Sequence, residues 1–378
     1  MNVLAKASAL LAPGSSNKSI GPIGIDFGLE SLHLVQLETG AGASPNVRAR
    51  ATLDYGCPRH EVLASPVKFR SLVKRALAAD RFSGRKAVIA IPPDMFRTFS
   101  INYQSAEGAD REAAAVLKVM KSRLDGDLAS YVIDYLPVRS RSKNDERLAL
   151  VAVSERQPII DFLEQARKAR LDVQALEIGP IAVCRLVGAL SQNIESGNVL
   201  VINSGRRVSY LTLISGSDLL FDQQVEFGET SLIAQTAETL DISEDMARNL
   251  VMQTGVACAA GSDTSPIAVE EAGLLETMTE ILKPHFLKLV EEIKRVCLYA
   301  AAETRGGAVS QIYLLGGIAR WPGSEDLLSS LTGSRVDKIQ DPLTLFRGED
   351  GTTPWDGGTA PDVVVATGAA LRGLQNHG

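Results

Sequence analysis

Short apolar runs with the period of β-strands alternate with helical stretches along most of the chain. Residues 23–40 form two such runs around the turn at Gly28, which predicts a strand, a tight turn and a second strand. Residues 66–81 have the apolar spacing of an amphipathic helix, and residues 86–93 predict a buried strand that two prolines end. The chain therefore begins as a strand hairpin that a helix and a further strand follow.

The middle and the end of the chain continue this alternation. Strands are predicted at 97–103, 131–138 and 147–154, and helices at 106–124 and 158–171. The hairpin pattern then returns at 198–216, and helices are predicted at about 230–240, 243–254 and 268–302, with His285 beside Pro284 as the start of a helix. A last strand, turn and helix pattern covers 311–331 and 363–374. Strands that alternate with helices indicate the α/β class.

An internal repeat relates the two hairpins. Residues 25–30 (IDFGLE) align with residues 202–207 (INSGRR) at an offset of 177 residues, close to half of the chain. In each copy an apolar run ends in Asp26 or Asn203, a glycine follows two positions later, and a second apolar run begins. A repeat of this length predicts a duplicated domain with a cleft between its halves.

Such a turn is suited to phosphate binding. Glycine lets the main chain approach an anion closely and point N–H groups at it. Asp26 beside the first turn can hold a hydrated Mg²⁺ through water, because Mg²⁺ keeps several waters and needs only one or two carboxylates. One such turn has little specificity, but two related copies followed by GGIARWPG at 316–323 are much more specific.

Composition narrows the functional classes. The 378 residues carry a net charge of −6, and 5% of them are aromatic, which argues against a dedicated nucleic-acid binder. The four cysteines are scattered without a C-x-x-C pair, so neither a zinc site nor a disulfide framework is expected. No apolar run reaches the ~18 residues of a membrane span. We therefore expect a cytoplasmic protein whose first 20 residues are a flexible tail.

The two glycine hairpins and the late segment GGIARWPG resemble the motifs of the superfamily of actin, heat-shock chaperones and sugar kinases. Within that superfamily the chain resembles the PilM family of type IV pilus assembly proteins, to which FtsA is related. The resemblance covers nearly everything from residue 20 onward and implies two RNase-H-like halves around ATP and Mg²⁺. It implies a first domain at 21–197 with an inserted subdomain at about 88–178. A second domain follows at 198–378, whose last helix packs back on the first domain.

The resemblance also implies a set of nucleotide-binding residues, and none that is catalytic. The two phosphate turns contribute Asp26, Gly28 and Leu29 from the first copy and Asn203, Gly205 and Arg206 from the second. The remaining positions are Gly228 in the segment VEFGETSL, Glu292 and Arg295 in the helix beside the adenine and ribose, and Gly316, Gly317 and Ile318 in the adenosine turn. Asp26 would hold Mg²⁺ indirectly, through water.

Several residues depart from the pattern of the family. Asn203 is neutral where Asp is usual, and Glu30 puts a carboxylate near the phosphates. His33 stands where lysine is usual, and Glu229 where a second glycine is usual. These changes predict weak or absent nucleotide binding, although Arg206 could contact phosphate directly.

The resemblance implies a scaffold that binds the cytoplasmic tail of an inner-membrane protein of the PilN type, and leaves contact with the pilus motor ATPase open. The membrane is then reached only through partners, and no nucleic acid is bound. Exposed strands in the 88–178 subdomain predict that the peptide adds to a sheet edge. The alternatives are an active actin-like ATPase and an FtsA-like filament-forming protein, and the oligomeric state stays open.

Overall fold

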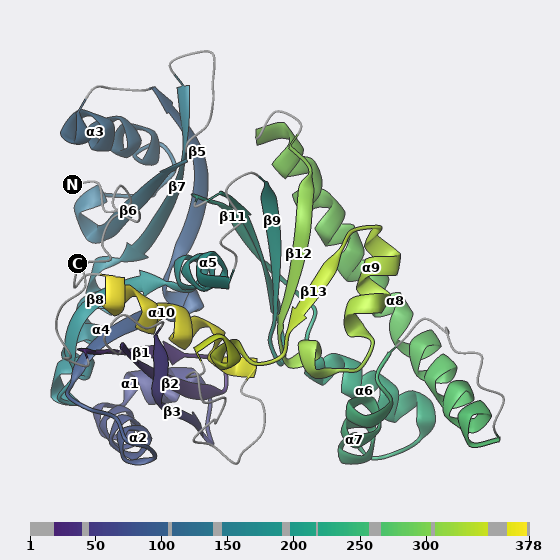
Figure 1. Ribbon diagram of the computed structural model, residues 1–378. Helices are drawn as coiled ribbons and strands as arrows, with labels where there is room; N and C mark the ends of the chain where they lie inside the picture. The colour runs from purple at the N-terminus through teal and green to yellow at the C-terminus, as the bar shows by residue number, and fades with distance from the viewer. Residues whose placement is uncertain are drawn as a thin grey trace. The chain divides into compact units, whose positions relative to one another are not determined.

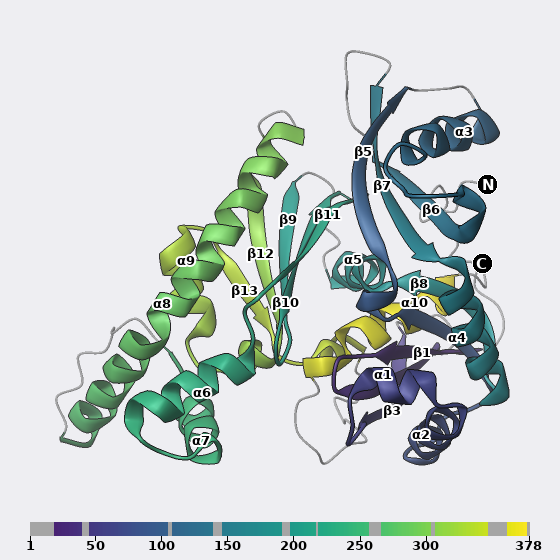
Figure 2. The same cartoon turned by 180° about the vertical axis from the view of Figure 1, so that it is seen from behind.

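The computed structural model describes residues 19–39, 45–104, 108–138, 146–190, 197–216, 218–256, 266–303, 307–346 and 361–375. The expected tail up to residue 18, the loop 139–145 and Cys258 lie outside these residues. The chain divides into two compact units (Figures 1 and 2). The first comprises Met1–Leu190, Leu343–Gly358 and Val363–Gly378, and the second Ser191–Pro342 and Thr359–Asp362. The domain boundaries given above from the sequence stay a prediction.

The first unit is built on a five-stranded sheet in the order β3-β2-β1-β4-β8. Its strands are β1 (Ser19–Phe27), β2 (Ser31–Thr39), β3 (Asn46–Asp54), β4 (Lys86–Ile91) and β8 (Asp172–Ile178). Strand β2 is antiparallel to both of its neighbours, β1 and β3, and β1, β4 and β8 are parallel. This sheet places the turn between β1 and β2 at the end of its central strand.

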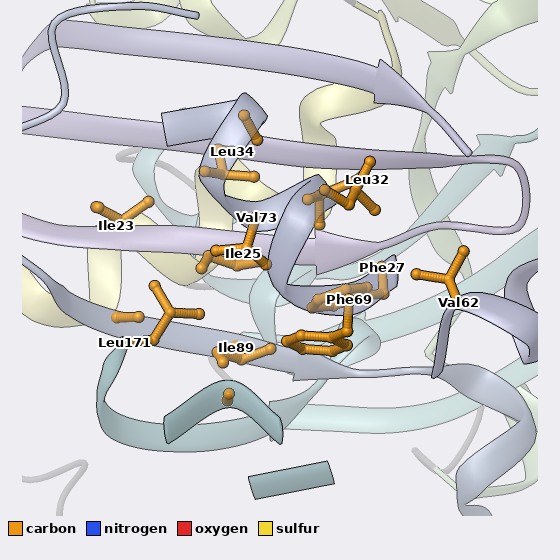
Figure 3. Packing of buried hydrophobic residues seen from close by; sticks show 14 of the residues in the cluster. Ile23, Ile25, Phe27, Leu32, Leu34, Val62, Phe69, Val73, Ile89 and Leu171 are labelled. Atoms are coloured by element: carbon orange, nitrogen blue, oxygen red, sulfur yellow. The ribbon is translucent and has the colours of Figure 1, made fainter. Parts of the chain in front are cut away.

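Alternating side chains of β1 pack on opposite faces of this sheet. On one face Phe27 stacks on Phe69 of α2 (Pro66–Ala78), with ring centroids 5.0 Å apart, and meets Phe162 of α4 (Arg156–Lys168) edge-on at 5.5 Å. Figure 3 shows Phe27 and Phe69 within the core of this unit. The same unit also contains α1 (Arg59–Ala64), α5 (Gly179–Leu190) and α10 (Val364–Gln375).

The opposite face of the sheet carries the last helix. A Cβ on Gly24 of β1 would lie 2.0 Å from the carbonyl oxygen of Ala366 in α10, so only glycine allows this approach. The buried Glu177 of β8 then fixes α10 and α5 together. It accepts hydrogen bonds from Arg185 of α5 (2.9 Å at each carboxylate oxygen) and from Arg372 of α10 (3.1 Å).

A small subdomain is inserted in the chain between β4 and β8. Its antiparallel sheet has the order β5-β7-β6, and α3 (Ala109–Met120) packs on one face of it, as both views show (Figures 1 and 2). Its strands are β5 (Arg97–Gln104), β6 (Tyr131–Val138) and β7 (Glu146–Glu155). The core between sheet and helix contains Ile101, Tyr103, Val116 and Val151.

The second unit repeats the main sheet of the first. The order β11-β10-β9-β12-β13 and the strand directions match those of β3-β2-β1-β4-β8 strand for strand. Its strands are β9 (Asn198–Ser204), β10 (Ser209–Ser215), β11 (Asp218–Val225), β12 (Val309–Gly316) and β13 (Val336–Ile339). The repeat at residues 25–30 and 202–207 therefore marks the same place in two equivalent sheets.

Among the described residues of the second unit, the α-helices are α6 (Glu229–Leu240), α7 (Glu244–Thr254), α8 (Pro266–Glu303) and α9 (Ser324–Thr332). In Figure 1, α8 and α9 lie on the same side of the sheet. Helix α8 runs without interruption through Pro284, so the expectation that His285 starts a helix is wrong. Pro284 is exposed, which leaves its ring on the solvent side of the helix. No helix in the described part of the chain is long and apolar enough to cross a membrane.

Candidate functional site

The first predicted phosphate turn joins β1 and β2 in the first unit. Asp26, the residue before the last of β1, lies directly opposite His33 of β2, and Gly28 begins the turn. The His33 imidazole is buried and lies against Gly28, while its Nδ1 is 3.1 Å from the hydroxyl of Thr52. Leu29 at the tip is 43% exposed.

Two residues that the sequence did not predict, Tyr55 and Arg59, hold this turn through hydrogen bonds to its main-chain carbonyls. The hydroxyl of Tyr55 donates to the carbonyl of Gly28 (2.9 Å), and the main-chain N–H of Tyr55 donates to the carbonyl of Glu30 (3.0 Å). The buried Arg59 donates to the carbonyl of Phe27 (3.2 Å) and pairs with Asp94 (3.0 Å). Burial raises the pKa of the Tyr55 phenol, and the negative charge of Asp26 raises it further. Tyr55 therefore stays a neutral hydrogen-bond donor.

The second predicted phosphate turn lies between β9 and β10 in the second unit. Asn203 stands opposite Tyr210, and the N–H of Gly205 donates to the carbonyl of Val208 (3.0 Å). The hydroxyl of Ser204 donates to the carbonyl of Leu315 (2.9 Å) and accepts the N–H of Ile318 (2.9 Å). Ser204 thus ties this turn to the end of β12.

The start of α6 closes against the same turn. The N–H groups of Glu229 and Thr230 donate to the carbonyls of Gly205 (3.2 Å) and Arg206 (2.7 Å). A Cβ on Gly228 would lie 2.4 Å from the carbonyl carbon of Arg207, so this close approach requires glycine. The first N–H groups of a helix are normally available to an anion, because they have no partner within the helix. Here the turn itself uses two of them.

The predicted adenosine turn, which follows β12, contacts the turn between β9 and β10. Gly316 has φ +86°, which favours glycine, and a Cβ there would lie 2.0 Å from the carbonyl oxygen of Ser204. A short 3-10 helix, Gly317–Arg320, follows and buries Ile318 completely. The turn between β9 and β10, the start of α6 and the turn after β12 therefore form one site in the second unit.

This site contains a buried carboxylate. Glu229 is 3% exposed and accepts hydrogen bonds from Arg320 (3.2 Å) and from the indole of Trp321 (3.3 Å). One of its oxygens lies 3.0 Å from where a Cβ of Gly317 would stand. We call Glu229, Gly317, Arg320 and Trp321 the Glu229 cluster. The guanidinium of Arg320 pairs with the carboxylate of Glu229, which keeps this charge at the turn after β12.

The other two predicted residues form a pair of their own on α8. Arg295 donates to Glu292 (2.6 Å), and Glu292 also accepts from Gln223 of β11 (3.3 Å). That the two phosphate turns face one cleft stays a prediction, as do Asp26 as an indirect Mg²⁺ ligand and the whole set of nucleotide-binding residues. Within the described ranges, no three His, Cys, Asp or Glu side chains gather into a group that could hold a metal ion.

Comparisons with known proteins place the fold. No protein-family model matches the chain, and no curated protein matches it. A chain of the "PilM-PilN type IV pilus biogenesis complex" matches with a TM-score of 0.69 and 18% identity, over 94% of this chain and 98% of that one. The predicted resemblance to PilM and the predicted fold class, an actin-like fold with duplicated domains and an inserted subdomain, are confirmed. At this identity the match concerns the fold alone.

Two further structures match over most of their length but at lower similarity. The ethanolamine utilization protein EutJ from Carboxydothermus hydrogenoformans has a TM-score of 0.48 and 16% identity, over 96% of this chain and 92% of that one. MreB 5 of Spiroplasma citri bound to AMPPNP has a TM-score of 0.48 and 12% identity, over 88% and 94%. We draw no argument from either.

Proposed function

We propose, starting from a fold shared with a chain of the PilM–PilN complex, that this protein is a cytoplasmic scaffold of a type IV pilus or related assembly platform. It binds the cytoplasmic tail of a PilN-like inner-membrane protein, which holds it at the membrane. The observation that carries the proposal is the match along nearly the whole of both chains, inserted subdomain included.

The tail is proposed to add as a strand to the inserted subdomain. Among the described residues, β5 and β6 each pair only with β7, so both are edge strands. Pro137 deprives β6 of one N–H, and the carbonyl of Tyr131 in β6 already accepts from Arg156 (3.1 Å). Strand β5 has eight residues and no proline, so its edge is the better template.

Synthetic peptides of the PilN-like tail test this mode of binding. Strand addition uses main-chain N–H groups of every second peptide residue. We therefore expect N-methylation at one set of alternate residues to weaken binding at least about tenfold, since each lost hydrogen bond is worth about 1 kcal/mol. Methylation of the other alternate set is the matched control and should have a small effect. Calorimetry measures both. Equal effects of the two sets would contradict strand addition, and failure of the unmodified tail to bind would contradict the proposed function.

The nucleotide cleft is proposed to be degenerate. Glu229 brings a buried carboxylate to the turn after β12, and the first amides of α6 donate to the turn between β9 and β10. Asn203 in place of Asp removes a charge that would hold a hydrated cation, and Glu30 adds a like charge to that of the phosphates. These features favour a scaffold over an ATPase.

We expect wild-type protein to bind ATP weakly or not at all, with turnover near background. Glu30→Ser combined with Asn203→Asp should strengthen binding about tenfold or more when Mg²⁺ is present. The reason is that one change removes a repulsion and the other restores a ligand, with charged hydrogen bonds worth ~1.5–3 kcal/mol. Calorimetric titration with and without Mg²⁺ measures this. Glu30→Ser with Asn203 unchanged is the control that separates the two terms. Tight Mg²⁺-dependent binding or brisk hydrolysis by the wild type would contradict a degenerate cleft.

A further inference from the structure

One end of the first unit concentrates exposed positive charge. The segments 70–86 and 164–172 contain nine Lys and Arg residues, all with exposed side chains. They are Arg70, Lys74, Arg75, Arg81, Arg85, Lys86, Arg167, Lys168 and Arg170. We call them the basic patch.

The topology brings the two segments together. Helix α2 leads into β4 and α4 leads into β8, and these parallel strands pair with Lys86 opposite Asp172. The N–H of Asp172 donates to the carbonyl of Arg85 (2.8 Å), so the two loops enter the sheet side by side. The helices before them are neighbours as well, since the rings of Phe69 and Phe162 have centroids 6.0 Å apart.

The charge of the patch is opposite to that of the rest of the chain. The same two segments contain three carboxylates, Asp80, Glu164 and Asp172, which gives them a net charge of +6. Since the whole chain carries −6, the remaining residues together carry −12. Cations at helix C-termini are stabilised by the helix dipole, which accounts for Arg75, Arg167 and Lys168. The helix dipole does not account for the other six cations of the basic patch.

Both loops are held firmly. The buried amide of Gln36 donates to the carbonyl of Ser83 (2.7 Å) and accepts its N–H (2.8 Å), which fixes the loop after α2. Arg170 closes α4 in the left-handed region at φ 64°, with its N–H on the carbonyl of Arg167 (2.8 Å). Glycine is the usual residue there, because it adopts this conformation without strain. An arginine therefore stands where backbone geometry favours glycine.

We propose that the basic patch binds the surface of a membrane that contains anionic lipids. Clusters of Lys and Arg are attracted to such surfaces without needing a shaped pocket. Proteins that bind single-stranded nucleic acid add exposed aromatic rings for stacking, whereas Phe82, the only aromatic residue in the two segments, is partly buried. The inference goes beyond the proposed function, in which a partner holds the protein at the membrane.

Sedimentation with lipid vesicles tests the proposal on the isolated chain. Wild-type protein should bind vesicles of phosphatidylcholine mixed with phosphatidylglycerol at low salt, bind phosphatidylcholine alone poorly, and dissociate as salt is raised. Arg81→Gln, Arg85→Gln and Lys86→Gln combined should lower the partition coefficient at least about tenfold. Lys283→Gln, Lys288→Gln and Lys294→Gln combined, on the exposed side of α8, change the charge equally and should leave binding unchanged.

The variant Arg170→Gly distinguishes a loss of contact with the lipid surface from a loss of folded protein. It should lower vesicle binding about fivefold while raising the unfolding temperature, because glycine relieves the left-handed position. Three results would overturn the proposal: no binding to phosphatidylglycerol vesicles at low salt, equal losses in the two triple variants, or tighter binding to a labelled RNA or DNA oligonucleotide than to vesicles. None of them affects the peptide titration, so the proposed function is tested independently.

Discussion

Glu177→Ala should lower the free energy of unfolding of the first unit by about 3–5 kcal/mol, because it leaves the largely buried guanidinium of Arg185 without its counter-charge. The side chain of Glu177 is 2% exposed and that of Arg185 is 14% exposed. Arg185 also donates to the carbonyl of Gly368 in α10 (2.7 Å), so the loss spreads to the packing of that helix. Urea unfolding followed by circular dichroism measures the change.

Two matched variants make this experiment specific. Arg372→Ala removes a partner that is 36% exposed, so we expect about 1 kcal/mol or less after solvent screening. Glu164→Ala removes an exposed i,i+4 pair with Lys168 and should change stability by less than about 0.5 kcal/mol. If Glu177→Ala proved no more destabilising than Glu164→Ala, the ion pair would not be what holds α10 in place.

Glu229→Ala should destabilise the second unit by about 3 kcal/mol, the cost of leaving buried donors without an acceptor. Trp321 is fully buried, and its indole N–H has Glu229 as its acceptor. Glu229→Gln keeps an acceptor oxygen for the indole and loses only the charge, so it should cost less than half as much. Chemical denaturation monitored by tryptophan fluorescence reports on this site when Trp355, the second tryptophan of the chain, is replaced by Phe in every variant.

The pair on α8 provides the control for this second experiment. Glu292 is 25% exposed and its partner Arg295 is 67% exposed, so Glu292→Ala should cost less than about 1 kcal/mol. A loss at Glu229 no larger than that at Glu292 would mean that the Glu229 cluster does not stabilise the unit.

The hairpins and the duplication could be predicted because their signals are local. The runs that end in Asp26 and Asn203 are apolar and short, and each is followed by a glycine turn. Strand β3 was missed because arginines interrupt its apolar positions. The structure accounts for Arg48 by a contact with Glu38 on the adjacent strand (2.8 Å), which a window on β3 alone does not contain.

The same distinction applies to the candidate site. Gly228 and Glu229 were recognised as a family position with one glycine replaced, but the partners of Glu229, Arg320 and Trp321, lie about ninety residues further along the chain. Tyr55 and Arg59 follow β3 in the chain and contact the first turn only in the folded protein, so no sequence motif predicts their role. Glycine spacing identifies a turn, whereas the acceptors that use its amides are set by tertiary folding.

The position of α10 has a consequence for the order in which the protein folds. Gly24 in the central strand of the first sheet needs the backbone of Ala366 as its cover, and Arg185 of α5 needs the carbonyl of Gly368. During synthesis, one apolar face of the first sheet therefore stays uncovered until the ribosome has made α10. Domains made first usually fold first, and uncovered apolar surface favours aggregation. Nascent chains that stop before residue 364 should thus depend on chaperones, even though nearly all of the first unit has already been translated.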